Sequence, residues 1–183
     1  MRAFAERGIS RAAHADVARL AGVSTATAFS YFRTRIDLTR EVLSCIARYY
    51  EAMADRFHQP DRPAARALLE HAVAFATSVD SDPAYARVVL EWSTAIREDT
   101  WPLFLRFQEG ILRRCMDTIT RGQAEGSIGA DTDPETAALM IIGSSWMVIQ
   151  MSFTQWPAER VHRFVLGQLR GALGAETVAR ALA

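Results

Sequence analysis

Residues 14–32 read HADVARLAGVSTATAFSYF, and this stretch decides the fold of the N-terminal part of the chain. Its apolar positions recur at helical spacing on both sides of an interruption that begins with Gly22. Gly22 permits the positive φ of a tight turn, the small Ala18 allows two helices to cross closely, and Val23 can fill the corner. Ser24 can then cap the second helix. The stretch therefore predicts a helix-turn-helix, and an ordinary corner between two helices is the alternative.

The outward face of the second predicted helix carries side chains that suit DNA. Short hydroxyl and methyl groups can approach base edges or phosphates in a major groove. The next predicted helix opens with Thr34 and Asp37 at the spacing of a capping box. Arg33 and Arg35 lie beside this helix N-terminus, which itself favours phosphate. The candidate DNA contacts from this pattern are Ser24, Thr25, Ala26, Thr27, Ser30, Tyr31, Arg33 and Arg35.

Composition supports a folded chain with a basic N-terminal part. The chain has 183 residues, of which 50% are hydrophobic and 23% charged, and this excludes a disordered protein. All 21 basic residues are arginines. Residues 1–48 hold eight of them against four acidic residues (+4), and residues 49–183 hold thirteen against seventeen (−4). A basic segment can meet a polyanion such as DNA. The two cysteines, Cys45 and Cys115, are too few for a disulfide framework, so we expect a cytoplasmic location.

Helical periodicity continues through the rest of the chain, so we expect an all-α protein. Asp82-Pro83 and Asp133-Pro134 each place a capping aspartate before a proline at the first helical position. We expect a helix-turn-helix domain over residues 1–45 and a ligand-binding and dimerisation domain over residues 46–183. The predicted helices run over about 1–7, 14–21, 25–32, 35–58, 63–79, 83–97, 101–125, 134–154 and 158–173.

Residues 136–158 contain no charged side chain, which raises the possibility of a membrane span. Serine, threonine and glutamine interrupt this run, and no arginine cluster flanks it. We therefore interpret the run as a central helix buried on several sides. We expect no membrane contact, and the N-terminus shows no signal-peptide pattern.

Several blocks of the sequence resemble one family. FAERGI at 4–9 and HADVARLAGVSTATAFSYFRTRIDLTREVL at 14–43 resemble the DNA-binding domain of the TetR family of bacterial transcriptional regulators. RGISRAAHAD at 7–16 and LEWSTAIREDTWPLF at 90–104 are similar to its LuxR/HapR/SmcR-type quorum-sensing master regulators. The resemblance implies a sequence-specific transcriptional regulator, either a repressor or an activator, and adds His14 to the DNA contacts. Family members begin a turn or two earlier, so the first helix is expected to be truncated here.

The resemblance also implies a homodimer that binds a pseudo-palindromic double-stranded DNA operator. An apolar stripe on the last long predicted helix, with two glycines four residues apart, suits such an interface. The alternative is that this stripe serves only the core of one chain. The candidate interface residues are Gly143, Val161, Phe164, Val165, Gly167, Leu169 and Gly171.

A small apolar effector bound in the C-terminal domain is the further partner that the resemblance implies. Aromatic and methionine side chains with few polar groups suit such a ligand, although an aromatic stripe at helical spacing also fits an ordinary core. The candidate ligand-binding residues are Phe75, Trp92, Trp101, Phe104, Met116, Trp146, Met147 and Gln150.

Signals for other chemistry are weak. Glu159 and His162 form a single E-x-x-H pair, and the second copy that a di-iron site needs is missing. Neither cysteine has a metal ligand at the usual spacing, and no nucleophile elbow or P-loop occurs. We therefore expect no catalytic residue, no metal site, no cofactor and no enzyme activity, and a buried structural Cys115 or, alternatively, a thiol sensor. The alternative function is a small helical ligand-binding protein or enzyme with the helix-turn-helix as a non-DNA module.

Overall fold

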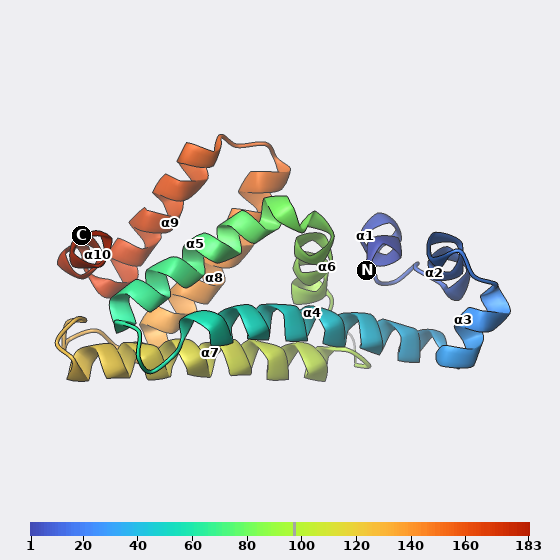
Figure 1. Cartoon of the computed structure of the whole chain (residues 1–183), viewed down its shortest axis with the longest axis horizontal. Coiled ribbons are helices and arrows are strands. Elements are labelled where there is room, and N and C mark those ends of the chain that lie inside the picture. The colour runs from blue at the N-terminus through green and yellow to red at the C-terminus, as the bar shows by residue number, and fades with distance from the viewer. Residues whose placement is uncertain (97) are drawn as a thin grey trace. The chain divides into compact units, whose positions relative to one another are not determined.

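The computed structural model describes residues 1–96 and 98–183, and all regular structure in these residues is helical (Figure 1). This confirms the all-α fold class. The helices of the described residues are α1 (Arg2–Arg7), α2 (His14–Ala21), α3 (Thr25–Tyr31), α4 (Arg35–Phe57), α5 (Ala64–Ser81), α6 (Pro83–Thr94), α7 (Trp101–Ala124), α8 (Pro134–Phe153), α9 (Ala158–Leu173) and α10 (Ala175–Leu182).

Nine of these helices were predicted, and α10 was missed. The predicted helix ends lie close to the observed ones, except that the predicted end at residue 97 falls outside the described residues. Gly174, with φ of 89°, ends α9 and starts α10. Helix α10 spans eight residues, of which Thr177 and Val178 are buried.

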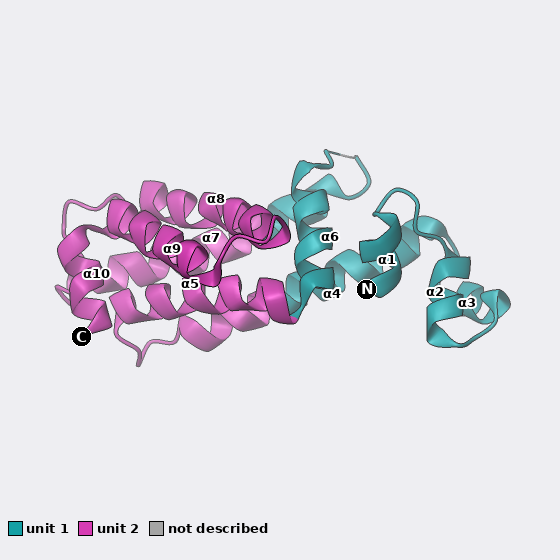
Figure 2. Cartoon of the chain, turned by 90° about the horizontal axis from the view of Figure 1, so that it is seen from above, with its two compact units in different colours: residues 1–49, 82–107 teal, residues 50–81, 108–183 magenta. Residues whose placement is uncertain are grey.

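The chain divides into two compact units (Figure 2). Unit 1 comprises Met1–Tyr49 and Asp82–Phe107, and unit 2 comprises Tyr50–Ser81 and Gln108–Ala183. The N-terminal helices are thus grouped with α6 and the start of α7. The domain expected over residues 1–45 does not include these two later segments. Both α4 and α7 continue from one unit into the other.

The helix-turn-helix in unit 1 forms as its turn chemistry predicts. Gly22 ends α2 in the left-handed conformation, with φ of 68° and ψ of 27°. Ser24 Oγ accepts a hydrogen bond from the Thr27 backbone N–H at 3.0 Å and so caps α3. Ala18 and Ala28 are buried where α2 and α3 pack together. The expectation that Val23 fills the corner is wrong, because its side chain is 45% exposed on an open turn.

A second set of contacts in unit 1 joins the N-terminal helices to α6. Helix α1 packs against α6, and the Ile9 backbone N–H donates to Glu91 Oε1 of α6 at 2.8 Å. Helix α6 begins with Pro83, as predicted, but the carboxylate of Asp82 makes no cap. It accepts a hydrogen bond from the Tyr49 hydroxyl at 2.8 Å instead. Unit 1 is therefore held together by segments that lie about eighty residues apart in sequence.

In unit 2, α5 and α9 pack against each other, and each of them also contacts α8 and α10. Asp133 caps α8 by accepting from the Thr136 backbone N–H at 2.8 Å, and hydrogen bonds from Thr136 lower the pKa of Asp133. Helix α8 is long and apolar enough to cross a membrane by length and composition, and 39% of its most apolar window is buried within the chain. Other apolar side chains of this helix, including Met140 and Met147, are exposed. The expectation of a helix buried on several sides thus holds for only part of its surface.

Candidate DNA interface and effector site

Helix α3 presents its predicted DNA-contacting side chains at the surface. Tyr31 is 78% exposed, Thr27 is half-buried, and the other candidates on this helix are exposed. Ser30 Oγ donates to the Thr27 backbone oxygen at 2.7 Å, and Ser24 Oγ lies 2.8 Å from Thr27 Oγ1. These local hydrogen bonds hold the hydroxyl groups in fixed rotamers, so a groove of DNA would meet an ordered surface.

His14 does not belong to this surface. Its side chain is 4% exposed, its ring stacks on Phe29 with centroids 3.9 Å apart, and its Nε2 lies 2.7 Å from the Phe32 backbone oxygen. The prediction that the His14 side chain contacts DNA is therefore wrong. The ring instead ties the start of α2 to the end of α3 across 18 residues, so it stabilises the motif.

The two arginines beside α4 differ in their surroundings. Arg33 is exposed. Arg35 is also exposed, but its Nη1 donates to the Ser10 backbone oxygen at 2.8 Å and so supports the loop after α1. The predicted capping box of α4 is confirmed, because Asp37 Oδ2 accepts from the Thr34 backbone N–H at 3.1 Å. Arg33 is thus the arginine whose donors are more available to a phosphate.

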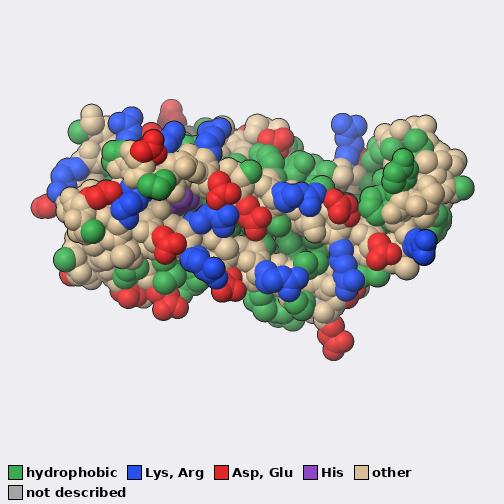
Figure 3. Space-filling model, turned by 60° about the horizontal axis from the view of Figure 1, so that its bottom comes forward, with side chains coloured by type: hydrophobic (Ala, Val, Ile, Leu, Met, Phe, Trp, Pro, Cys, Tyr) green, Lys and Arg blue, Asp and Glu red, His purple; other side chains and the backbone are tan. Residues whose placement is uncertain are grey.

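Charges are mixed on the face of the molecule drawn in Figure 3. Arginine side chains in blue alternate there with carboxylates in red, so no large patch of one sign forms on that face. The net charge of +4 on residues 1–48 therefore does not by itself mark a binding surface there. The stronger indication of DNA binding remains the geometry of α2, the turn and α3.

The predicted dimer residues separate into two groups. Val161, Val165 and Leu169 are 7%, 3% and 0% exposed, so they are covered by their own chain, and their assignment to a dimer interface is wrong. The four-residue spacing puts these three side chains on the side of α9 that packs in unit 2. The other candidates stay predictions: Phe164 is half-buried and Gly143, Gly167 and Gly171 are exposed.

The predicted ligand residues do not form one group within either unit. In unit 1, Trp92 and Phe104 are buried, with ring centroids 5.4 Å apart, and Trp101 stacks on Phe104. In unit 2, the side chains of Met147 and Gln150 are exposed on α8, which contradicts their assignment to an enclosed pocket. Helix α8 is apolar on all sides, so its sequence could not show which side faces inward. In the same unit, the half-buried residues Phe75, Met116 and Trp146 stay predicted.

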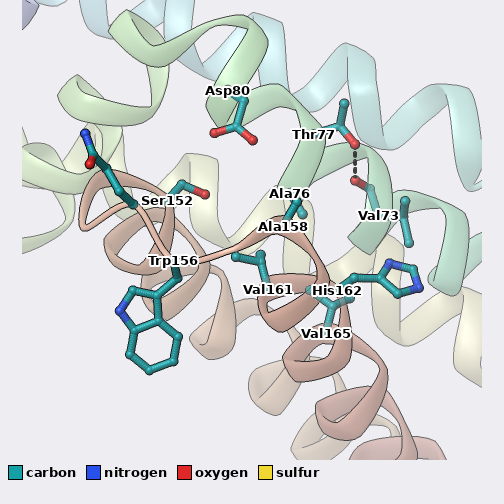
Figure 4. A pocket seen from close by; sticks show the side chains of 11 residues that line it. Val73, Ala76, Thr77, Asp80, Ser152, Trp156, Ala158, Val161, His162 and Val165 are labelled. Atoms are coloured by element: carbon teal, nitrogen blue, oxygen red, sulfur yellow. Dashed lines mark hydrogen bonds between the residues drawn. The ribbon is translucent and has the colours of Figure 1, made fainter.

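Unit 2 contains a groove that the sequence did not indicate (Figure 4). We call it the α5–α9 groove. It has a volume of about 450 Å³ and is lined by Val73, Ala76, Thr77, Asp80, Ser152, Gln155, Trp156, Ala158, Val161, His162 and Val165. Valines form its apolar part, Asp80 supplies a carboxylate from α5, and Trp156 extends from the connection between α8 and α9. None of the predicted ligand residues lines it.

Unit 2 also holds a cluster that sequence spacing could not reveal. His58 directly follows α4, His71 lies on α5 and Cys115 on α7, and their ligand-type atoms all lie within 4.8 Å of one another. His58 Nε2 is 2.9 Å from His71 Nδ1, and His58 Nδ1 is 2.8 Å from Thr118 Oγ1. Burial is the main cause that lowers the pKa of His58 to about 4 and of His71 to about 3, so both imidazoles are neutral at pH 7.

Comparisons with known proteins agree with the helix-turn-helix. The sequence model for "Bacterial regulatory proteins, tetR family" matches residues 1–42. The chain is similar to the HTH-type transcriptional regulator LuxR of Vibrio harveyi, with 31% identity over 145 residues, which cover 79% of this chain and 71% of that protein.

Solved structures share the fold of the whole chain. The regulator FadR of Bacillus subtilis, in complex with stearoyl-CoA, superposes with a TM-score of 0.78 at 18% identity, covering 94% of each chain. The regulator CifR, a cysteine mutant complexed with a 26 bp operator DNA, has a TM-score of 0.70 at 20% identity, covering 92% of this chain and 90% of that one. At these identities the likeness concerns the fold alone.

Proposed function

Because this chain belongs to the tetR family of bacterial regulatory proteins and is a helix-turn-helix transcriptional regulator, we propose that it reads its operator through α3 and responds to a small molecule bound in unit 2. The observation that carries the DNA part is the exposed, hydrogen-bonded surface of α3 after the Gly22 turn. Thr25, Ala26 and Tyr31 reach the major groove, and Arg33 contacts a phosphate.

Residues 1–45 serve in this proposal as the DNA-binding part, and the remainder binds the ligand and the second subunit. Helices α8 and α9 pair with the same helices of a second copy. The exposed side chains of Leu139, Met140 and Met147 on α8 support this pairing, because 44–46% of each side chain is exposed in the single chain. Two α3 helices then enter major grooves about 34 Å apart on a pseudo-palindromic operator.

The effector binds in the α5–α9 groove. Its volume of about 450 Å³ is within the range of small-molecule sites. Val73, Val161 and Val165 contact the apolar part of the ligand, and Asp80 accepts a hydrogen bond from a polar group. The rival location in unit 2 lies among Phe75, Met116 and Trp146, as the sequence predicted. The protein catalyses no reaction in this role. It acts in the cytoplasm, where the operator DNA is.

Fluorescence anisotropy with labelled DNA tests the operator proposal. The wild-type protein is titrated into the intergenic duplex upstream of its own gene and into a scrambled duplex, each at two salt concentrations. We expect tight, sequence-dependent binding that Ala26→Glu abolishes, because the new carboxylate would enter the major groove of the negatively charged DNA. Thr120→Glu adds the same charge at an exposed position of α7 and should leave binding unchanged. Ala26→Glu binding as tightly as wild type would refute the role of α3.

Intrinsic fluorescence distinguishes the two effector locations. Compounds that raise the melting temperature of the protein are titrated into wild type, Trp156→Phe and Trp146→Phe. If the effector binds in the α5–α9 groove, the change in tryptophan fluorescence that the compound causes in the wild-type protein disappears in Trp156→Phe. The same change persists in Trp146→Phe. The opposite result moves the site to Trp146 and its neighbours.

A further inference from the structure

The His58–His71–Cys115 cluster has the chemistry of a metal site. Two imidazoles and a thiol converge from three different segments of unit 2, with their ligand-type atoms within 4.8 Å of one another. The Cys115 side chain is 1% exposed, and Phe57 stacks on His71 with ring centroids 6.0 Å apart. His58 and His71 are half-buried, and Cys115 is buried. None of these groups takes part in the proposed operator or effector contacts.

The histidines are prepared for ligation. A metal-bound histidine keeps its proton on the nitrogen away from the metal, where a protein acceptor usually holds it. Thr118 Oγ1 is placed to accept the proton of His58 Nδ1, so His58 Nε2 accepts the hydrogen bond from His71 Nδ1. Metal binding would replace this hydrogen bond, with the proton of His71 moving from Nδ1 to Nε2. Both imidazoles are neutral at pH 7, which is the state that binds metals.

The distances are close to those of a three-ligand site. Metal–nitrogen bonds of about 2.0 Å and a metal–sulfur bond of about 2.3 Å would separate the ligand atoms by roughly 3.5–3.8 Å in a trigonal arrangement. His58 Nε2 and His71 Nδ1 are 2.9 Å apart, and the widest separation in the cluster is within 4.8 Å. The two nitrogens would therefore have to separate by roughly 0.6 Å, and the sulfur lies no more than 4.8 Å from either of them.

The local charge selects among cations. Arg114 pairs with Asp55, with Nε and Oδ1 2.5 Å apart, and Arg121 pairs with Glu125 at 2.9 Å, so each of these two arginines has a carboxylate partner. A monovalent cation with one thiolate leaves the buried site neutral, whereas a divalent cation leaves a net positive charge that burial disfavours. Thiolate and imidazole are also ligands that suit copper.

We propose that His58 Nε2, His71 Nδ1 and Cys115 Sγ form a buried three-coordinate site for Cu⁺. When Cu⁺ binds, the S–H bond of Cys115 breaks, a Cu–S bond forms, and the proton passes to solvent; copper does not change its oxidation state. The site then joins the end of α4, α5 and α7 within unit 2. This departs from the expectation of no metal site, because the ligands meet through tertiary packing and not through sequence spacing.

Competition for Cu⁺ tests the proposal on the wild-type protein. Metal-free protein is titrated anaerobically, with ascorbate present, against Cu⁺ held by bathocuproine disulfonate, whose coloured complex reports the copper that remains. We expect one Cu⁺ per chain to leave the chelator and to raise the melting temperature. X-ray absorption at the copper edge should show two nitrogen ligands and one sulfur ligand, a result that needs no variant to fold. Retention of all Cu⁺ by the chelator, or a different ligand set, overturns the proposal.

Variants assign the ligands, and circular dichroism checks their fold. Cys115→Ala and His71→Gln should lose copper binding. Cys45→Ser is the matched control, because Cys45 is the other cysteine and lies in unit 1, and this variant should bind as wild type. Loss of binding in Cys45→Ser, or retention of one equivalent of Zn²⁺ but no Cu⁺ in a parallel indicator titration, overturns the proposal.

Discussion

Acidification from pH 7 to pH 5 should destabilise unit 2, because burial keeps two of its imidazoles neutral. Burial lowers the pKa of His71 to about 3, and the positive charge that His58 can take adds to this effect. Burial also lowers the pKa of His58 to about 4, with smaller contributions from Arg114 and Arg121, while Asp55 acts in the opposite direction. Neither ring therefore gains a proton in the folded chain at pH 5.

The magnitude follows from the difference between the folded and unfolded chains. In the unfolded chain both histidines titrate near pH 6.5, so below that pH the unfolded state binds more protons and its free energy falls. Stability is therefore fully present above about pH 7 and is lost as the pH falls from about 6.5 to the folded-state pKa values, about 4 for His58 and about 3 for His71. At pH 5 each imidazole lowers the free energy of unfolding by about 2 kcal/mol, and the pair by roughly 3–4 kcal/mol.

Urea unfolding followed by circular dichroism measures this loss, with a chelator present so that no metal contributes. The free energy of unfolding is determined at pH 7 and pH 5 for wild type, for the double variant His58→Gln/His71→Gln and for His162→Gln. The double variant should lose much less stability than wild type on acidification. His162 is exposed on α9, so its replacement should leave the loss unchanged. An equal loss in the double variant and in wild type would refute the reasoning and assign the acid sensitivity to other groups.

Other regions of the chain give further expectations. Arg33→Ala should reduce the slope of log affinity against log salt concentration by about one. Tyr31→Ala should weaken binding with little change of this slope, because a neutral contact releases no counterion. Equal slopes in wild type and Arg33→Ala would exclude a contact between Arg33 and a phosphate. Gly22→Ala should lower the free energy of unfolding by about 1 kcal/mol or more, since φ is 68° and alanine is strained there; a melting temperature equal to wild type would contradict this. Met147→Glu should convert the dimer into a monomer in light scattering, and a dimer that persists would remove the exposed face of α8 from the interface.

The helix-turn-helix could be predicted from sequence because its determinants are local. A glycine in the left-handed conformation and a serine cap, whose Oγ accepts from the backbone N–H three residues later, both act over a single turn. His14 shows where this reasoning ended. The family resemblance placed His14 among the DNA contacts, but its ring packs on Phe29 and its Nε2 lies within hydrogen-bond distance of the Phe32 carbonyl oxygen, so contacts across the motif decide its burial.

The candidate sites in unit 2 depended on information that periodicity does not contain. The apolar stripe of α9 could cover its own chain or a second one, and Val161, Val165 and Leu169 cover their own. Helix α8 has no polar side, so its sequence left open which residues face outward. His58, His71 and Cys115 come from three separate segments of the chain. Their spacing in the sequence does not show that their side chains meet in the folded protein.

The contact between α1 and α6 has a consequence for how such proteins can be recombined. An N-terminal fragment that stops after the helix-turn-helix would leave the Ile9 N–H without Glu91 and the apolar side of α1 without α6. The helix-turn-helix segment is thus not an independent folding unit. A chimera that transfers this segment to another regulator needs to carry residues 82–107 along with residues 1–49. Changes of operator preference by single substitutions on α3 avoid this constraint, because they leave both halves of unit 1 in place.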